Sequence, residues 1–206
     1  MQFGPHGVNL PPKLLRVAKK IQERGGFTVR KIDMRDFGEE VARFKRIYNS
    51  AWEKNWGFVP LTDAEIDHMA AGLRQMLDPD IAIFAEKDGE PIGTMLPLPD
   101  LNQALIRAYP RPGVPEWWTM VKLLWHWKVC RRVTTMRAFA GGVLEQYRGR
   151  GVDAVLIVSL AEAAIPRYRR CEISWVLENN TMMRRTAEMF GAEVYRTYRV
   201  YEKKLN

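Results

Sequence analysis

The chain has 206 residues, of which 47% are hydrophobic and 27% charged, with a formal net charge of +8. These proportions are typical of a soluble globular protein, and the length suits one domain with an appendage. No apolar run approaches the ~18 residues that a transmembrane helix needs, and the first ten residues lack the regions of a signal peptide. Cys130 and Cys171 lack metal-ligand or redox spacing. We therefore expect a cytoplasmic protein without stable membrane insertion, metal site or disulfide framework.

The N-terminal part of the chain predicts a helix, a strand and two further helices. Residues 11–23 repeat apolar side chains at helical spacing and are followed by a glycine pair, so we interpret residues 1–26 as a helical extension or the remnant of a linker. Residues 27–32 alternate as a strand does, and residues 34–52 carry one apolar helical face. The sequence Thr-Asp-Ala-Glu at 62–65 is a capping box that opens the next helix.

The middle of the chain predicts a hairpin and an aromatic helix. Residues 81–86 and 91–96 read as short strands joined by a turn around Asp88-Gly89. A proline-rich stretch follows, irregular apart from a short helix near residues 101–108. Residues 116–131 are helical in composition, with apolar side chains on almost every side. Such a helix is buried or contacts something apolar, so core packing or a dimer contact is the first interpretation. The wall of an acyl-chain or acceptor pocket and contact with a membrane surface are the alternatives.

The C-terminal part alternates strands and helices. The predicted strands are residues 133–143, 172–177 and 193–202, and the predicted helices are residues 152–165 and a segment that Asn180 caps and Gly191 ends. The whole order of elements predicts an α+β domain with a mixed, mostly antiparallel central sheet flanked by helices.

One turn in this part of the chain carries the clearest chemical signal. Residues 145–153 read Glu-Gln-Tyr-Arg-Gly-Arg-Gly-Val-Asp and join the predicted strand 133–143 to the helix that begins at residue 152. A strand that stops at glycines and leads into a helix leaves several backbone N–H groups free, and the helix dipole adds its positive end. The turn therefore suits a phosphate or pyrophosphate.

This turn and the order of elements resemble the GNAT superfamily, the Gcn5-related N-acetyltransferases. In that family the fourth strand ends in Arg/Gln-x-x-Gly-x-Gly/Ala, which cradles the pyrophosphate of acetyl-coenzyme A. The sequence Arg-Gly-Arg-Gly-Val-Asp at 148–153 fits, except that Asp153 stands where Gly or Ala is usual; a second register, starting at Gln146, fits fully. The resemblance implies that residues 27–206 form the acyltransferase domain. The cofactor-binding residues it implies are Val143, Leu144, Arg148, Gly149, Arg150, Gly151, Val152, Asp153 and, on the pantetheine arm, Asn180.

A narrower resemblance concerns the aromatic-rich sequence at residues 48–60 and the sequence Tyr-Arg-Val-Tyr-Glu at 198–202. Both are similar to the C-terminal half of longer bacterial GNAT-like proteins of unclear substrate.

A bulky side chain in place of Gly151 is expected to abolish coenzyme A binding without unfolding the protein.

The resemblance implies direct attack of a neutral amine on the thioester of acetyl-CoA or another acyl-CoA, with backbone N–H groups near Val143 holding the acyl oxygen. Glu145 and Glu178 are the candidate bases and Tyr198 is a candidate acid, whereas Ala187 stands at the position where relatives often carry the acidic Tyr. We therefore predict an N-acetyltransferase that uses acetyl-CoA. Its acceptor amine is unidentified; the tryptophans suggest a bulky or apolar one, and a homodimer is left open.

Two alternatives from other classes are weighed against this prediction. A non-catalytic GNAT-like domain that binds CoA or serves in assembly is favoured by Ala187 and Asp153. A nucleic-acid-binding protein is favoured only by the charge, since residues 129–206 hold 14 Lys and Arg against 8 Asp and Glu. We do not expect nucleic acid to be a partner, because exposed aromatic side chains interleaved with basic ones are lacking outside the last predicted strand.

Overall fold

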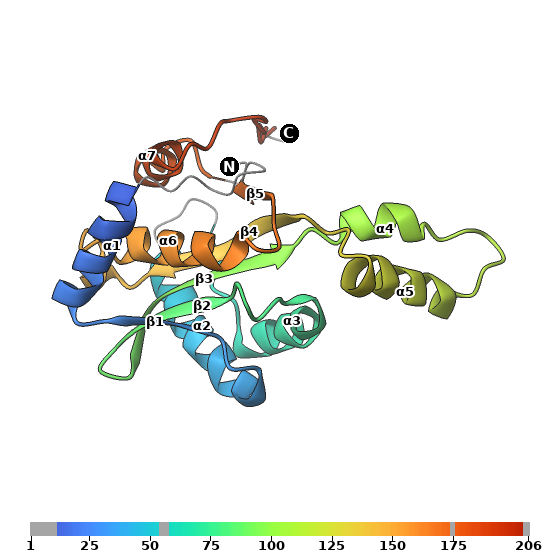
Figure 1. Cartoon of the computed structure of the whole chain (residues 1–206), viewed down its shortest axis with the longest axis horizontal. Helices are drawn as coiled ribbons and strands as arrows, with labels where there is room; N and C mark the ends of the chain where they lie inside the picture. The colour runs from blue at the N-terminus through green and yellow to red at the C-terminus, as the bar shows by residue number, and fades with distance from the viewer. Residues whose placement is uncertain (1–11, 54–57, 174–175, 204–206) are drawn as a thin grey trace.

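The computed structural model describes residues 12–53, 58–173 and 176–203, and within them it confirms the predicted α+β class (Figure 1). One five-stranded sheet has the order β1-β2-β3-β4-β5. The strands are β1 (Thr28–Lys31), β2 (Ile83–Lys87), β3 (Glu90–Pro99), β4 (Thr135–Val143) and β5 (Arg170–Ile173). The first four strands pair antiparallel, and β5 pairs parallel with β4.

Helices cover both faces of this sheet (Figure 1). The helices are α1 (Pro12–Gly25), α2 (Phe37–Trp52), α3 (Asp63–Met76), α4 (Asn102–Ala108), α5 (Glu116–Leu124), α6 (Val152–Ala164) and α7 (Thr181–Met189). Three shorter turns of helix are η1 (Met34–Asp36), the π-helical η2 (Trp125–Val129) and η3 (Glu145–Tyr147). Helix α6 lies on one face with α1 against it, and α2 and α3 lie on the other face.

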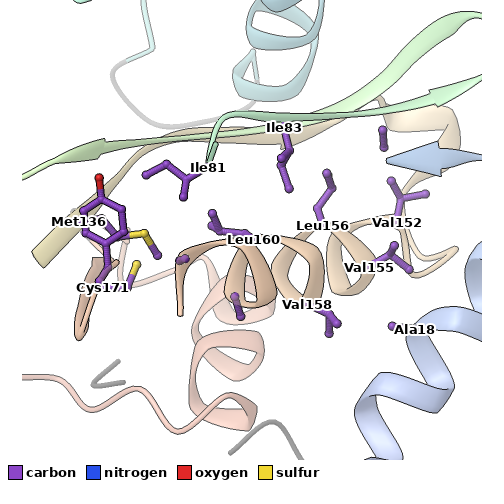
Figure 2. Close-up of a cluster of buried hydrophobic side chains, with 14 of the residues drawn as sticks. Ala18, Ile81, Ile83, Met136, Val152, Val155, Leu156, Val158, Leu160 and Cys171 are labelled. Carbon is purple, nitrogen blue, oxygen red and sulfur yellow. The ribbon is translucent and has the colours of Figure 1, made fainter. Parts of the chain in front are cut away.

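The larger apolar core lies between α6 and the sheet. Figure 2 shows Leu156 and Leu160 of α6 pointing toward Ile81 and Ile83 beside them, and all four are buried. Val158 on the opposite side of α6 is also buried, since α1 lies there and contributes Ala18. The sheet and α1 together therefore supply the apolar cover that an almost wholly apolar helix needs.

A second, smaller core lies between α2 and the other face of the sheet. Ile47 of α2 packs there with Phe84 of β2 and Leu96 of β3, all buried. Glu40, also in α2, is 1% exposed and accepts hydrogen bonds from Arg30 of β1 and from Arg43. This buried ion pair fixes α2 to the first strand, and it satisfies a carboxylate that burial would otherwise destabilise.

Local signals in the sequence give elements close to those predicted. Thr62 and Glu65 form the capping box at the start of α3, and Asp88 and Gly89 take positive φ angles of 53° and 81° in the β2–β3 turn. The side chain of Asn180 accepts a hydrogen bond from the backbone N–H of Met183 and caps α7, as predicted. Each of these features depends on residues a few positions apart, so the sequence window contains all the partners.

The prediction for the last strand is wrong. Residues 192–203 have no strand structure and are almost entirely exposed. Their alternation of Tyr195, Thr197 and Arg199 favours a strand only where a neighbouring strand offers a ladder. The neighbour would be β5, which is four residues long and starts at Arg170, two residues earlier than predicted. Residues 174–175 of the predicted strand 172–177 lie outside the described part of the chain.

The aromatic helix was interpreted as a core helix or a dimer contact, and the structure does not place it in the core. None of the residues of α5 or of its π-helical continuation η2 is buried. The pair α4 and α5 extends beyond the ends of β3 and β4, away from both helical layers (Figure 1). Most apolar side chains of α5 therefore remain in solvent, whereas Leu123 of α5 and Trp127 of η2 are partly buried and pack against the larger core.

Candidate functional site

Strand β4 changes its pairing along its length. It pairs with β3 from Met136 to Val143, and a register shift leaves Phe139 as an extra residue between Ala138 and Ala140. Its ladder with β5, in the described residues, ends at the pair Ala138–Ile173. A β-bulge bends the strand and strengthens its twist, and bulges occur next to active sites. The second half of β4 therefore has an edge that no described strand covers.

The glycine turn directly follows this edge. Leu144, the first residue after β4, donates its N–H to the carbonyl of Ile92 at 2.9 Å. Gly149 and Gly151 have positive φ angles of 71° and 79°, conformations that favour glycine. The chain then enters α6, whose first turn leaves N–H groups without carbonyl partners.

The N–H groups of residues 149–154 donate to no described acceptor, because the first bond into α6 runs from Val155 to the carbonyl of Gly151 at 3.1 Å. These groups lie at the positive end of the α6 dipole. The turn thus has the geometry that the sequence predicted for a phosphate or pyrophosphate group.

The two arginines of the turn differ in their contacts. Arg148 donates from Nε to the carbonyl of Val143 at 3.2 Å and from Nη2 to the carbonyl of Ala51 at 2.9 Å. It therefore ties the end of β4 to the end of α2. Arg150 is exposed, its guanidinium lies 5.6 Å from the ring centre of Tyr147, and it forms no ion pair with a described carboxylate. Arg150 is thus the arginine available to an anion.

The remaining predicted residues of the turn occupy different environments. Val152 is buried against the core, so it can offer a bound group only its backbone N–H. Asp153 is partly exposed in the first turn of α6, where a carboxylate suits the helix dipole. A Cβ atom added to Gly151 would lie 2.9 Å from Cδ1 of Ile21 in α1. Both this contact and the positive φ angle would strain the turn, so a bulky residue at Gly151 is expected to lower the stability of the fold as well as block the binding of a phosphate.

The end of α2 packs closely on the second half of β4, and the sequence did not reveal this contact. A Cβ atom added to Gly142 would lie 2.6 Å from Cβ of Ala51, so only glycine permits the approach. Trp52 donates its indole N–H to the carbonyl of Gly141 at 3.1 Å and stacks on Tyr48 at 5.1 Å between ring centres. An aromatic wall therefore stands beside the free edge of β4. Trp56, which the sequence analysis associated with Trp52, lies outside the described residues.

The predicted catalytic residues are exposed. Glu145 lies in η3, at the start of the glycine turn. Glu178 follows β5 and accepts a hydrogen bond from Arg199, which lowers the pKa of its carboxyl below the ordinary value. Tyr198 lies in the exposed C-terminal segment beside Arg196. No described contact joins Glu178 or Tyr198 to the glycine turn.

The carboxylate of β5 was not singled out from the sequence. Glu172 is partly buried and accepts hydrogen bonds from the hydroxyl of Tyr195 and from Arg137. The hydrogen bond from Tyr195 lowers the pKa of Glu172 and raises that of Tyr195. This contact fixes the C-terminal segment to the sheet without a strand ladder, and no local pattern in the sequence announces it.

Asn180 has its side-chain oxygen bonded to the N–H of Met183. Its amide nitrogen donates to no described group and so can serve a ligand. In the described part of the chain, no three His, Cys, Asp or Glu side chains gather as a metal site would require. A search of the same residues finds no helix with the length and apolar composition that crossing a bilayer takes.

Comparison with proteins of known sequence gives two relatives that match almost the whole chain. A bacterial ceramide synthase of Caulobacter vibrioides is 38% identical over 197 residues, which is 92% of this chain and 50% of that protein. The protein YghO of Escherichia coli is 35% identical over 199 residues, 94% of this chain and 50% of that protein. The chain thus spans about half the length of these relatives. No family model matches it.

Solved structures share the fold at low sequence identity. The aminoglycoside N-acetyltransferase AAC(6')-Iy in complex with CoA superposes with a TM-score of 0.54 and 15% identity, over 87% of this chain and 95% of that one. A possible acetyltransferase from Clostridium difficile superposes with a TM-score of 0.52 and 13% identity, over 87% of this chain and 98% of that one. At these identities the likeness concerns the fold.

Proposed function

We propose that this chain, which has the GNAT fold, is the acyltransferase unit of an enzyme that joins the acyl group of an acyl-CoA to the amine of a long-chain amino alcohol. The N–H groups of residues 149–154, turned outward at the end of a bulged strand, are the observation that carries the proposal. The 38% identity to a bacterial ceramide synthase supports the class of acceptor, because a ceramide is the amide of such a base.

Residues of the turn bind the phosphate end of the acyl-CoA. The N–H groups from Gly149 to Asp153 donate hydrogen bonds to the pyrophosphate oxygens, and Arg150 supplies a positive charge from the solvent side. The amide nitrogen of Asn180 binds the pantetheine arm, as the family resemblance implies. The described ladder between β4 and β5 ends at Ala138, so the pantetheine arm can lie along the second half of β4 and add its own hydrogen bonds to that edge.

The reacting groups meet near the end of β4. There a neutral amine attacks the thioester carbonyl, the C–N bond forms, the C–S bond breaks, and the thiolate takes up a proton. Backbone N–H groups near Val143 stabilise the charge on the carbonyl oxygen as it develops. Most of the rate enhancement comes from holding both substrates in one orientation.

The proton acceptor in this reaction stays a prediction. Glu145 and Glu178 remain the candidates, and Tyr198 remains the candidate acid. The hydrogen bond from Arg199 lowers the pKa of Glu178, so its carboxylate takes a proton from an ammonium less readily than an unperturbed one would.

The aromatic wall of Phe44, Tyr48 and Trp52 stands where the acceptor would approach. Stacked aromatic side chains suit a hydrocarbon chain. Acetyl-CoA was the predicted donor; the relation to a ceramide synthase favours a longer acyl group, and the proposal therefore covers acyl-CoAs of any length.

The test is a turnover assay on the purified chain. Acetyl-, octanoyl- and palmitoyl-CoA are each incubated with sphinganine or, as a water-soluble control amine, ethanolamine, and the amide and the released CoA are quantified. We expect equimolar amide and CoA with sphinganine. Arg150→Glu should weaken acyl-CoA binding at least tenfold, whereas Lys13→Glu, an equally exposed cation at the far end of α1, should not.

Two results would contradict the proposal in different ways. Binding of CoA without turnover of either amine would favour the non-catalytic alternative, for which Ala187 is the specific observation. Turnover that Arg150→Glu leaves unchanged would mean that the glycine turn is not the cofactor site.

A further inference from the structure

Residues 102–132 form an arm that projects beyond the sheet and its two helical layers, and only its base, with Ala104, Leu123 and Trp127, packs against the larger core. The arm comprises α4, the turn at 109–115, α5 and η2, and it extends beyond the ends of β3 and β4 (Figure 1). Its two helices pack on each other through Ala104 and Ala108, both fully buried. Pro110, Pro112 and Pro115 restrict the turn between them, so the arm is a preformed element.

The arm exposes far more apolar surface than is expected of a helix pair that stands in water. Trp117 is 64% exposed, Trp118 46% and Trp125 56%. The other large apolar side chains that the arm exposes are Leu105, Ile106, Tyr109, Met120, Val121, Leu124 and Val129. Large apolar side chains exposed in such number on one helix pair indicate a site of interaction with a protein or a membrane.

The arm is also strongly basic. Its cations are Arg107, Arg111, Lys122, Lys128, Arg131 and Arg132, and its one carboxylate is Glu116. None of these cations forms an ion pair with a carboxylate of the described chain, although such pairs are frequent on the sheet and on α2. The partner of the arm must therefore be apolar and anionic together.

This combination discriminates between the two obvious partners. A second copy of the chain would cover the tryptophans, but an arm-to-arm contact would bring two basic surfaces together, which is unfavourable. The surface of a bilayer with anionic lipids satisfies both requirements. Tryptophan rings settle at the level of the headgroups, and nearby Lys and Arg side chains are attracted to the negative surface.

We propose that the arm docks on membrane surfaces that contain anionic lipids, with Trp117, Trp118 and Trp125 at the interface. The contact is peripheral, since no described helix could cross the bilayer. Docking leaves the glycine turn in water, because the arm returns to the sheet at the start of β4 and the turn follows the other end of that strand. The proposal goes beyond acyl transfer and does not depend on it.

The experiment measures binding to phosphatidylcholine vesicles with and without 30% phosphatidylglycerol, by co-sedimentation and by tryptophan fluorescence. Four of the seven tryptophans lie in the arm, so its burial shifts the emission to shorter wavelength. We expect the wild-type chain to bind the anionic vesicles, with a blue shift, and to bind the neutral vesicles at least tenfold more weakly.

Two variants test the two components separately. Trp117→Ser/Trp118→Ser removes apolar surface, and Arg107→Glu/Arg111→Glu reverses charge; each should weaken binding to anionic vesicles at least tenfold. The matched control is Met182→Ser/Met189→Ser, which removes exposed apolar side chains from α7 and should bind as the wild type does. Circular dichroism of each variant verifies that the fold is retained.

The proposal is overturned if the wild-type chain does not bind anionic vesicles, or if the arm variants bind as well as the control. Sedimentation equilibrium without vesicles identifies the competing partner. A dimer that Trp117→Ser/Trp118→Ser dissociates, together with absent vesicle binding, would assign the arm to a second copy of the chain.

Discussion

Helices α5 and α6 have similar apolar composition and opposite environments. Seven of the thirteen residues of α6 are buried, whereas none of the nine residues of α5 is. The sheet covers one side of α6 and α1 covers another; in the described structure, α5 packs mainly against α4 and its own continuation, and Leu123 reaches the larger core. Composition shows that a helix needs apolar cover, and the topology of the chain decides whether the chain itself provides it.

The largest expected difference between the two helices is the cost of removing a leucine side chain. Leu156 in α6 is 1% exposed, so Leu156→Ala should lower the free energy of unfolding by about 2–5 kcal/mol, because it leaves a cavity. Leu124→Ala in α5, at 46% exposure, should change it by less than about 0.5 kcal/mol. Urea unfolding measures both. Equal losses would show that α5 is buried in solution.

Cysteine reactivity provides the same contrast without a change in sequence. Cys171 lies in the α6 core, and burial raises the pKa of its thiol to about 11 from an ordinary value of 9.0. Its thiolate fraction near pH 8 is therefore about a hundredfold lower than that of an unperturbed thiol. Cys130, at the base of the arm, is accessible. We expect a thiol reagent to modify one cysteine rapidly, and mass spectrometry of peptides should identify it as Cys130. Modification of Cys171 first would contradict the assignment of the core.

A buried carboxylate at the end of α6 extends the comparison to polar groups. Asp78 is buried and accepts hydrogen bonds from the hydroxyl of Tyr168 at 2.6 Å and from Arg167 at 2.9 Å. Asp78→Ala leaves the Tyr168 hydroxyl without an acceptor and should cost about 1–3 kcal/mol in urea unfolding. Asp80→Ala is the control, because its ion pairs with Lys31 and Arg167 are exposed, and surface pairs contribute about 0–1 kcal/mol.

The smallest effect is expected at the exposed carboxylate Glu178. Its contact with Arg199 lowers its pKa, which makes the carboxylate a weak base. Glu178→Gln should therefore lower kcat in the turnover assay by less than threefold, whereas loss of a general base costs about 10²–10⁴-fold. A hundredfold loss with an unchanged KM for the acyl-CoA would restore Glu178 as the base.

Whether the sequence predicted a feature depends on how far apart along the chain the contacting residues lie. The glycine turn, the capping box at Thr62 and the cap by Asn180 are local, and local residues predicted them. The bulge at Phe139 depends on pairing with β3, about 40 residues earlier, and the close approach of Ala51 to Gly142 joins residues about ninety apart, so no window of sequence contains the partners.

The prediction of the last strand failed because a local pattern was present but a distant partner was missing. Residues 193–202 alternate as a strand does, but the described part of β5 offers too short a partner, and the hydrogen bond from Tyr195 to Glu172 holds the segment instead. In the same way, the composition of α5 is that of a buried helix, so core packing or a dimer contact was the first interpretation. A pattern records what a segment can form, and the neighbours decide what it does form.

The most direct test of the central claim is thermal melting of the chain with CoA, acetyl-CoA and octanoyl-CoA, beside Arg150→Glu. A CoA species at 100 times its Kd should stabilise the fold by about 2.7 kcal/mol, which raises Tm by about 5–10 °C for a domain of this size. The account predicts that rise for the wild-type chain and a much smaller one for Arg150→Glu. A cooperative transition whose Tm none of the CoA species changes would contradict it.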